Sequence, residues 1–212
     1  EGIEHEECTK CHEKFDIKEI KKLKHICNDE GICTICGNKV ATSGLIYKLN
    51  EDKKSYYVSE YIGIDIDIII PAKYDGLYVT SIGDSAFSNF IGLTSIEIPN
   101  SVTSIKYGAF SGCIGLTSIE IPDSVTTIES FAFSGCIGLT RVEIPDSVTI
   151  IGAFAFSGCT GLTSIEIPNS VTSIRYFAFS GCTGLTSLEI PASVINIEDS
   201  AFSGCQNLTS II

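Results

Sequence analysis

The sequence predicts a mostly β fold, a right-handed solenoid built from 23-residue repeats. A block of this length, FSGCIGLTSIEIPDSVTTIESFA, recurs with few changes from Ala86 onward in a chain of 212 residues. Self-similarity at a fixed period of this size is typical of folds in which each repeat forms one turn and stacks on the next. One phenylalanine marks each period: Phe87, Phe110, Phe133, Phe156, Phe179 and Phe202.

Each repeat contains two short extended segments and a corner. Residues 116–122 alternate apolar and polar side chains in the core sequence IEI, which predicts a strand with one buried face. Pro122 ends this strand because proline has no N–H to donate to a neighbouring strand. Residues 125–128 form the second extended segment. Gly135 then gives the backbone the freedom that a corner requires.

The sequence divides into three regions. Residues 1–40 form a small cysteine-rich, zinc-ribbon-like module, residues 41–85 an N-terminal cap with a first atypical turn, and residues 86–212 the repeat array. In the cap we expect a β-hairpin between residues 45 and 61 and a buried strand at 68–70. The following loop, 72–78, is longer than its counterparts in later turns, as expected for an end repeat.

The N-terminal module is a candidate zinc site. Two C-x2-C pairs, separated by 21 residues, supply the four candidate ligands: Cys8, Cys11, Cys33 and Cys36. Zinc prefers four such ligands in a tetrahedron, and each pair can chelate from one tight turn. The short helix expected between the pairs would bury little apolar surface. We therefore favour a structural Zn²⁺ ion as the group that stabilises the module. Disulfides and free thiols remain open, with Cys27, His12 and His25 as spare ligands.

The other five cysteines occur once per repeat: Cys113, Cys136, Cys159, Cys182 and Cys205. They belong to a core column, where a thiol behaves as a small apolar group. Side chains stacked in parallel do not meet the dihedral of about 90° that a disulfide needs. We therefore expect buried free thiols, with bonding or metal ligation as the alternative.

The repeats resemble a known family. The motif AFSGCTGLTSIEIPNSVTSI is similar to the BspA-like (Treponema pallidum-type) leucine-rich repeats, and the resemblance covers residues 43–212. The segments GLIYKLNEDKKSYYVSEYIG and IDIIIPAKYDGLYVTSIGDSAF resemble the cap and first turn of such proteins. The resemblance implies a leucine-rich-repeat solenoid, display at a cell surface, and adhesion or protein–protein contact with host or community partners.

Composition excludes several classes of function. The net charge is -12, and residues 61–212 carry only four bases, so phosphate backbones are repelled and nucleic-acid binding is disfavoured. No run of about 20 apolar residues predicts a membrane span. The chain has no Met and stops within a strand at Ile212, so we expect a piece of a longer protein.

Catalysis is not expected. The three histidines, His5, His12 and His25, all lie in the cysteine-rich module, and the repeat array has none. The serines and threonines recur at repeat positions without a general base beside them in the pattern. The chain is therefore predicted to be a non-enzyme.

Two columns of the array are candidate partner-binding surfaces. The first is acidic and alternates with buried positions: Glu97, Glu120, Glu143, Glu166 and Glu189. It is either a solvated face or a docking strip for a basic partner or Ca²⁺. The second is aromatic and occurs only in the middle repeats: Phe131, Phe154 and Phe177. It is either an exposed patch for a partner or a cover over the turn.

These observations favour a non-catalytic, secreted or cell-surface leucine-rich-repeat domain that mediates protein–protein interaction or adhesion, with a host or matrix protein as the expected kind of partner. A structural spacer within a larger surface protein is the alternative. Carbohydrate binding ranks lower, because such sites usually use Trp or Tyr platforms and the chain has no Trp. The oligomeric state stays open.

Overall fold

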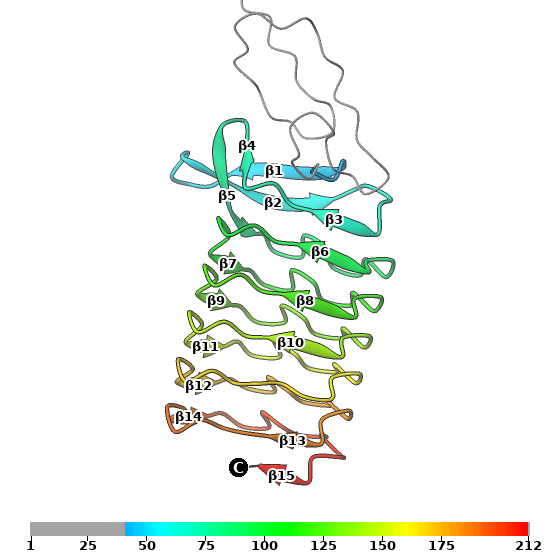
Figure 1. Cartoon of the computed structure of the whole chain (residues 1–212), viewed down its shortest axis with the longest axis vertical. Helices are drawn as coiled ribbons and strands as arrows, with labels where there is room; N and C mark the ends of the chain where they lie inside the picture. The colour runs from blue at the N-terminus through cyan, green and yellow to red at the C-terminus, as the bar shows by residue number, and fades with distance from the viewer. Residues whose placement is uncertain (1–40, 212) are drawn as a thin grey trace, which may run out of the picture.

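A computed structural model describes residues 41–211, which form a β-solenoid with its turns stacked along the long axis (Figure 1). The described residues contain strands and turns but no helix. Near the N-terminal end lie β1 (Leu45–Leu49), β2 (Ser55–Tyr61), β3 (Asp67–Ile69), β4 (Lys73–Tyr74) and β5 (Leu77–Ile82). The next turns give β6 (Ser95–Glu97), β7 (Ser104–Ile105), β8 (Ser118–Glu120), β9 (Thr127–Ile128) and β10 (Arg141–Glu143). The last are β11 (Ile150–Ile151), β12 (Ser173–Ile174), β13 (Ser187–Leu188), β14 (Asn196–Ile197) and β15 (Ser210–Ile211).

The strands lie on two sides of the solenoid. One side is a nine-stranded sheet in the order β1-β2-β5-β7-β9-β11-β12-β14, with β4 beside β5. The other side is a series of short parallel pairs, β3 with β6, β8 with β10, and β13 with β15. Figure 1 shows β6, β8 and β10 on one side and β7, β9 and β11 on the other. Most repeats therefore supply both extended segments expected from the sequence, and the turn that contains Glu166 has an isolated bridge in place of one of them.

The register keeps equivalent residues together. In the large sheet Ile105 pairs with Ile128, Ile128 with Ile151, and Ile151 with Ile174. Each partner is 23 residues further along the chain, so a residue type that recurs at this period forms a continuous column. The spacing between paired residues in the sheet thus equals the repeat length of the sequence. The repeat therefore decides which side chains are neighbours.

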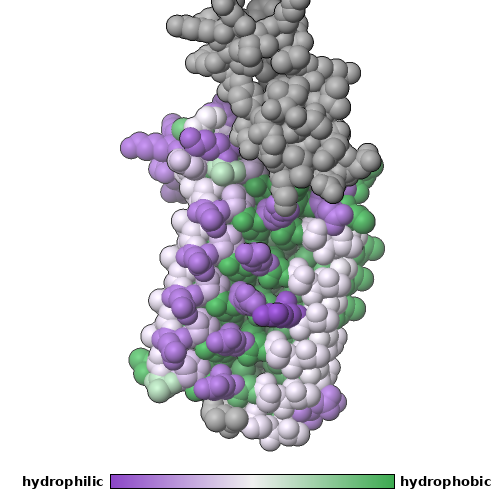
Figure 2. All heavy atoms as spheres, in the orientation of Figure 1, coloured by the Kyte–Doolittle hydropathy of each residue, from purple (hydrophilic) through white to green (hydrophobic). Residues whose placement is uncertain are grey.

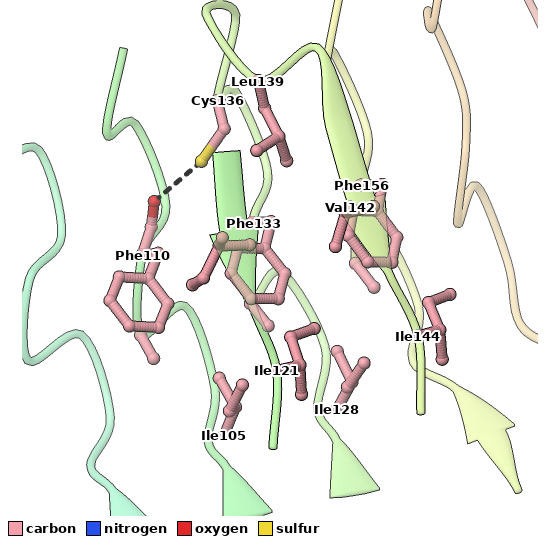
Figure 3. Close-up of a cluster of buried hydrophobic side chains, with 14 of the residues drawn as sticks. Ile105, Phe110, Ile121, Ile128, Phe133, Cys136, Leu139, Val142, Ile144 and Phe156 are labelled. Atoms are coloured by element: carbon pink, nitrogen blue, oxygen red, sulfur yellow. Dashed lines mark hydrogen bonds between the residues drawn. The ribbon is translucent and has the colours of Figure 1, made fainter. Parts of the chain in front are cut away.

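The core consists of such columns. Figure 3 shows Phe110, Phe133 and Phe156 in one row, and their ring centroids are 5.3 Å apart between successive turns. Leu139, in a second column, has no solvent-exposed surface. Stacking of this kind buries in each turn apolar surface that a single turn could not bury alone.

The repeat cysteines are free thiols, as predicted. Cys113, Cys136, Cys159 and Cys182 are buried, and Cys205 in the last turn is partly exposed. Each thiol donates to the carbonyl oxygen of a phenylalanine 26 residues earlier, as Cys136 does to Phe110 over 3.1 Å (Figure 3). This bond ties each turn to the one before it and satisfies the only polar group of the side chain.

The region before the repeats has more structure than expected. β1 and β2 form the predicted antiparallel hairpin and occupy one end of the large sheet. The segment 72–78, expected to be a long loop, is a tight hairpin of β4 and β5. Asp75 and Gly76 turn it with φ angles of 46° and 77°. Two successive positive φ angles suit a two-residue hairpin turn, and Asp-Gly is a favoured sequence for one.

The cysteine-rich module, with Cys8, Cys11, Cys33 and Cys36, lies outside the described residues. The same holds for the three histidines of the chain, which are all found before residue 41. The zinc site therefore stays a prediction.

Candidate interaction surfaces

The predicted acidic column is a continuous ladder of carboxylates on the side of the short parallel pairs. Glu120 is in register with Glu143, and Glu143 with Glu166. All five members are exposed: Glu97, Glu120, Glu143, Glu166 and Glu189. Figure 2 shows hydrophilic side chains in columns along this face, separated by apolar ones. We call the five residues the acidic ladder.

The acidic ladder gains charge from a second column three residues further along each turn. There Asp123 and Asp146 are exposed, and Asn100 and Asn169 take the equivalent places. Arg141 offsets part of the charge, because its guanidinium pairs with the carboxylate of Glu143. Within residues 41–211 no group of three or more Asp, Glu, His or Cys side chains is placed to hold a metal ion.

The aromatic column lies at the corner that follows the large sheet, and its rings stack along the solenoid axis. The ring centroids of Phe131 and Phe154 are 4.6 Å apart, and those of Phe154 and Phe177 are 4.8 Å apart. The interplanar angles are 7° and 11°, so the rings are nearly parallel. Tyr107 continues the row toward the N-terminus, at 5.3 Å from Phe131. We call Phe131, Phe154 and Phe177 the phenylalanine ladder.

The backbone of the phenylalanine ladder is in an unfavourable conformation. Its three residues have φ angles of 61°, 56° and 55°, in the left-handed region. At the equivalent corners the chain places Ser85, Gly108 and Ser200, with φ angles of 55°, 58° and 59°. A bulky L-residue at such an angle costs about 1–2 kcal/mol. The fold requires the left-handed corner, but it does not require phenylalanine there.

The stacking decides which part of each ring a partner can reach. Both faces of the Phe154 ring, and one face of each of the other two rings, are covered by a stacked neighbour, so ring edges make up much of the partly exposed surface of the ladder. Sugars usually stack on an open aromatic face, whereas apolar side chains pack well against ring edges. Tyr107 and Tyr176 lie beside the ladder and are about half exposed, at 49% and 50%. The corner is therefore an amphipathic aromatic strip.

A third column was not predicted from the sequence. Ile91, Ile114 and Ile137 occupy the same position in successive turns and are exposed at 65%, 42% and 48%. Later turns carry Thr160, Thr183 and Gln206 at this position. This change from apolar to polar residues could have indicated in the sequence that the position is exposed, because a core position would have stayed apolar in every repeat.

No helix long and apolar enough to cross a bilayer occurs in the described residues.

The repeats match a family model described as the BspA type leucine rich repeat region, in six copies over residues 80–209. A leucine-rich-repeat protein of T. pallidum has a similar structure, with 35% sequence identity and a TM-score of 0.77, and the match covers 79% of this chain and 78% of that one.

Two further solved structures are similar over about half of their own length. One is a leucine-rich-repeat protein of Bacteroides ovatus, with 29% identity, a TM-score of 0.62, and coverage of 81% of this chain and 52% of that one. The other is a leucine-rich cell surface protein of Faecalibacterium prausnitzii, with 31% identity, a TM-score of 0.59, and coverage of 80% and 53%. No curated protein matches the sequence significantly. The repeat count, the period and these similarities agree, and the chain belongs to the BspA-type leucine-rich-repeat family.

Proposed function

We propose that this chain is a non-catalytic protein-binding domain, secreted or displayed at a cell surface, that acts in adhesion. The observation that carries the proposal is the phenylalanine ladder. Phe131, Phe154 and Phe177 occupy left-handed corners that serine and glycine fill in other turns of the same solenoid. Bulky residues held at positive φ cluster at functional sites, and the fold does not require phenylalanine at these corners.

The ladder suits a protein partner. Clustered aromatic side chains dominate the binding energy of many protein interfaces, because they bury a large area and lose little conformational entropy. The exposed tyrosines Tyr107 and Tyr176 add hydroxyl groups beside the ring edges. An apolar side chain of a partner would pack against those edges while its backbone bonds to the tyrosines.

The acidic ladder would act at longer range. Its carboxylates stack on successive turns, so they set up a negative potential along the whole face. Such a potential speeds association with a basic partner and weakens with salt. The similar protein of F. prausnitzii is described as a cell surface protein, which supports the proposed location of this chain.

The direct test compares binding to a panel of purified extracellular matrix proteins. The full chain is immobilised beside the variant Phe131→Ser/Phe154→Ser/Phe177→Ser. Serine already fills this corner at positions 85 and 200, so the fold is expected to survive. Binding to at least one matrix protein should weaken by about tenfold or more, or about 1.4 kcal/mol.

The matched control is Ile91→Ser/Ile114→Ser/Ile137→Ser, which removes three exposed apolar side chains from a different column. It should bind like the unchanged chain. Failure of the unchanged chain to bind any matrix protein would favour the spacer function instead. Equal losses in both triple variants would show that the ladder has no special role.

The acidic ladder gives a separate prediction. Glu120→Gln/Glu143→Gln/Glu166→Gln removes the repulsion between stacked carboxylates, so the free energy of unfolding should be unchanged or slightly higher. Association with a basic matrix protein should become slower and lose its salt dependence. Stopped-flow association rates at low and physiological salt measure the effect. Removing three carboxylates elsewhere, with Glu60→Gln/Asp84→Asn/Asp199→Asn, should leave most of the salt dependence in place.

We also propose that the cysteine-rich module binds one structural zinc ion through Cys8, Cys11, Cys33 and Cys36. The spacing of its two C-x2-C pairs supports this ligand set. Native mass spectrometry should find one zinc per chain, and Cys8→Ser/Cys11→Ser should abolish it. Chelation should remove amide protection before residue 41 and leave the solenoid protected. A chain without zinc whose unreduced mass shows paired cysteines would establish disulfides instead.

A further inference from the structure

A polar groove lies at the hairpin end of the large sheet. Its floor is the outer surface of β2, β5 and β7, and the turn after β1 forms one wall. Tyr57, Ser81 and Ser104 form one row across the floor, because each is in register with the next. The hollow has a volume of about 680 Å³, within the range of ordinary ligand sites.

The aromatic part of the groove floor is the ring of Tyr57, which lies against a glycine. A Cβ atom at Gly83 would lie 2.7 Å from the ring of Tyr57, so glycine lets this ring rest against the sheet. The same position carries charged side chains at Lys106, Glu129, Arg175 and Glu198, and glycine again at Gly152. The Nζ atom of Lys106 lies over this ring, 5.3 Å from its centroid. In the row that runs from Tyr57 through Ser81 and Ser104 to Thr127, Tyr57 alone is aromatic, so the aromatic floor belongs to this end of the array.

The wall of the groove is held in place by its own hydrogen bonds. Asn50 Nδ2 donates to Ser55 Oγ over 2.8 Å and to Thr80 Oγ1 over 3.0 Å. Asp52 accepts from the backbone N–H of Lys54 over 2.8 Å and from the hydroxyl of Ser55 over 3.2 Å. These bonds fix the turn against β5, so the groove is formed before any ligand arrives.

The chemistry of the lining favours an uncharged, hydroxyl-rich ligand. Serine and threonine hydroxyls line the floor, and they both donate and accept hydrogen bonds. Two lysines face three carboxylates around the rim, so the charges are nearly balanced: Lys48, Lys106, Glu51, Asp52 and Asp84. Among the described residues that line the groove, Tyr57 supplies the aromatic ring, and tyrosine combines an apolar face with a hydroxyl.

We propose that this groove binds a neutral oligosaccharide. Sugar rings present hydroxyls at their edges and C–H groups on their faces, and the groove offers polar groups around one aromatic ring. Lys106 would donate to a sugar hydroxyl once the ligand lies over Tyr57. This activity goes beyond protein binding and is independent of the phenylalanine ladder, because no member of the ladder lines the groove.

The test uses the full chain and saturation-transfer NMR with maltohexaose, cellohexaose, mannohexaose and N-acetylchitohexaose. At least one should bind, with an affinity measurable by titration. Tyr57→Ala removes the ring, and Ser104→Trp fills the groove from β7. Each variant should weaken binding by about tenfold or more. Thr127→Trp places the same bulk one strand further along the same row and should bind like the unchanged chain.

Thermal unfolding of each variant shows whether it is folded, and Ser104→Trp tests the groove even if Tyr57→Ala unfolds. Absence of binding to all four oligosaccharides would overturn the proposal. Binding that Ser104→Trp and Tyr57→Ala leave unchanged would overturn it too, because the sugar would then bind elsewhere. Neither result bears on the matrix-protein test, which depends on a different set of side chains.

Discussion

Replacing Leu139 by alanine is expected to lower the free energy of unfolding by about 2–5 kcal/mol. Leu139 has no exposed surface and belongs to a column that continues as Leu116 and Leu162, which are also fully buried. Removal of its side chain leaves a cavity between turns that cannot collapse, because hydrogen bonds fix the turns on both sides. Urea unfolding followed by circular dichroism measures the loss.

Ile137→Ala is the matched control. It truncates a side chain of similar size two residues away in the same turn, where 48% of the residue is exposed. Its expected cost is below about 1 kcal/mol. Because stacked repeats unfold together, Leu139→Ala should shift the whole transition and not split it. A loss below about 0.5 kcal/mol would show that the side chain does not contribute to the core as its burial implies.

The repetitive part of this fold could be predicted from the sequence because period and register coincide. Once the period of 23 was known, the pairing of Ile105 with Ile128 followed, and with it the columns of phenylalanine, leucine and cysteine. The alternation of apolar residues around each glutamate also placed the acidic ladder correctly on the solvent side. In a periodic sequence, residues one repeat apart are in contact, so the long-range contacts can be predicted from the period. An ordinary globular sequence has no such period.

The sequence analysis missed the left-handed corners and the features that break the repeat. The left-handed backbone of Phe154 could have been inferred from Gly108, which fills the same corner in an earlier turn. The hairpin at 72–78 was signalled by Asp75-Gly76 but was interpreted as a loop. The polar groove had no local signal, because it forms only when the turn after β1 packs over β5. Contacts between non-repeated segments need the three-dimensional arrangement.

The second large effect is expected in the chemistry of the cysteine column. Burial raises the pKa of the Cys113 and Cys182 thiols from 9.0 to about 12, because the buried site disfavours the thiolate. At pH 8 the thiolate fraction then falls from about one in ten to about one in ten thousand. The thiolate is the nucleophile, so alkylation should be at least about a thousandfold slower in the folded chain than in urea.

Cys205 provides an internal control for this experiment. It is only partly buried, in the last turn, and burial raises its pKa as well. It should therefore react first among the repeat cysteines. Iodoacetamide labelling at pH 8, resolved by mass spectrometry of chymotryptic peptides, gives the rate at each position. Rapid native labelling of Cys136, Cys159 and Cys182 would contradict the buried column.

The same thiols make stability depend on pH in a defined direction. Their pKa values are higher in the folded chain than in the unfolded chain, so folding keeps protons bound that the unfolded chain loses. Their contribution is complete below about pH 9 and is lost as the pH rises toward 12. Cys113→Ala/Cys182→Ala removes two of these groups and should flatten the fall in stability between pH 9 and 11, measured by urea unfolding, although its stability at pH 7 is lower. An equal slope in the variant and the unchanged chain would mean that thiolate formation does not oppose folding, and that the thiols are more accessible to water than their hydrogen bonds to the preceding turns imply.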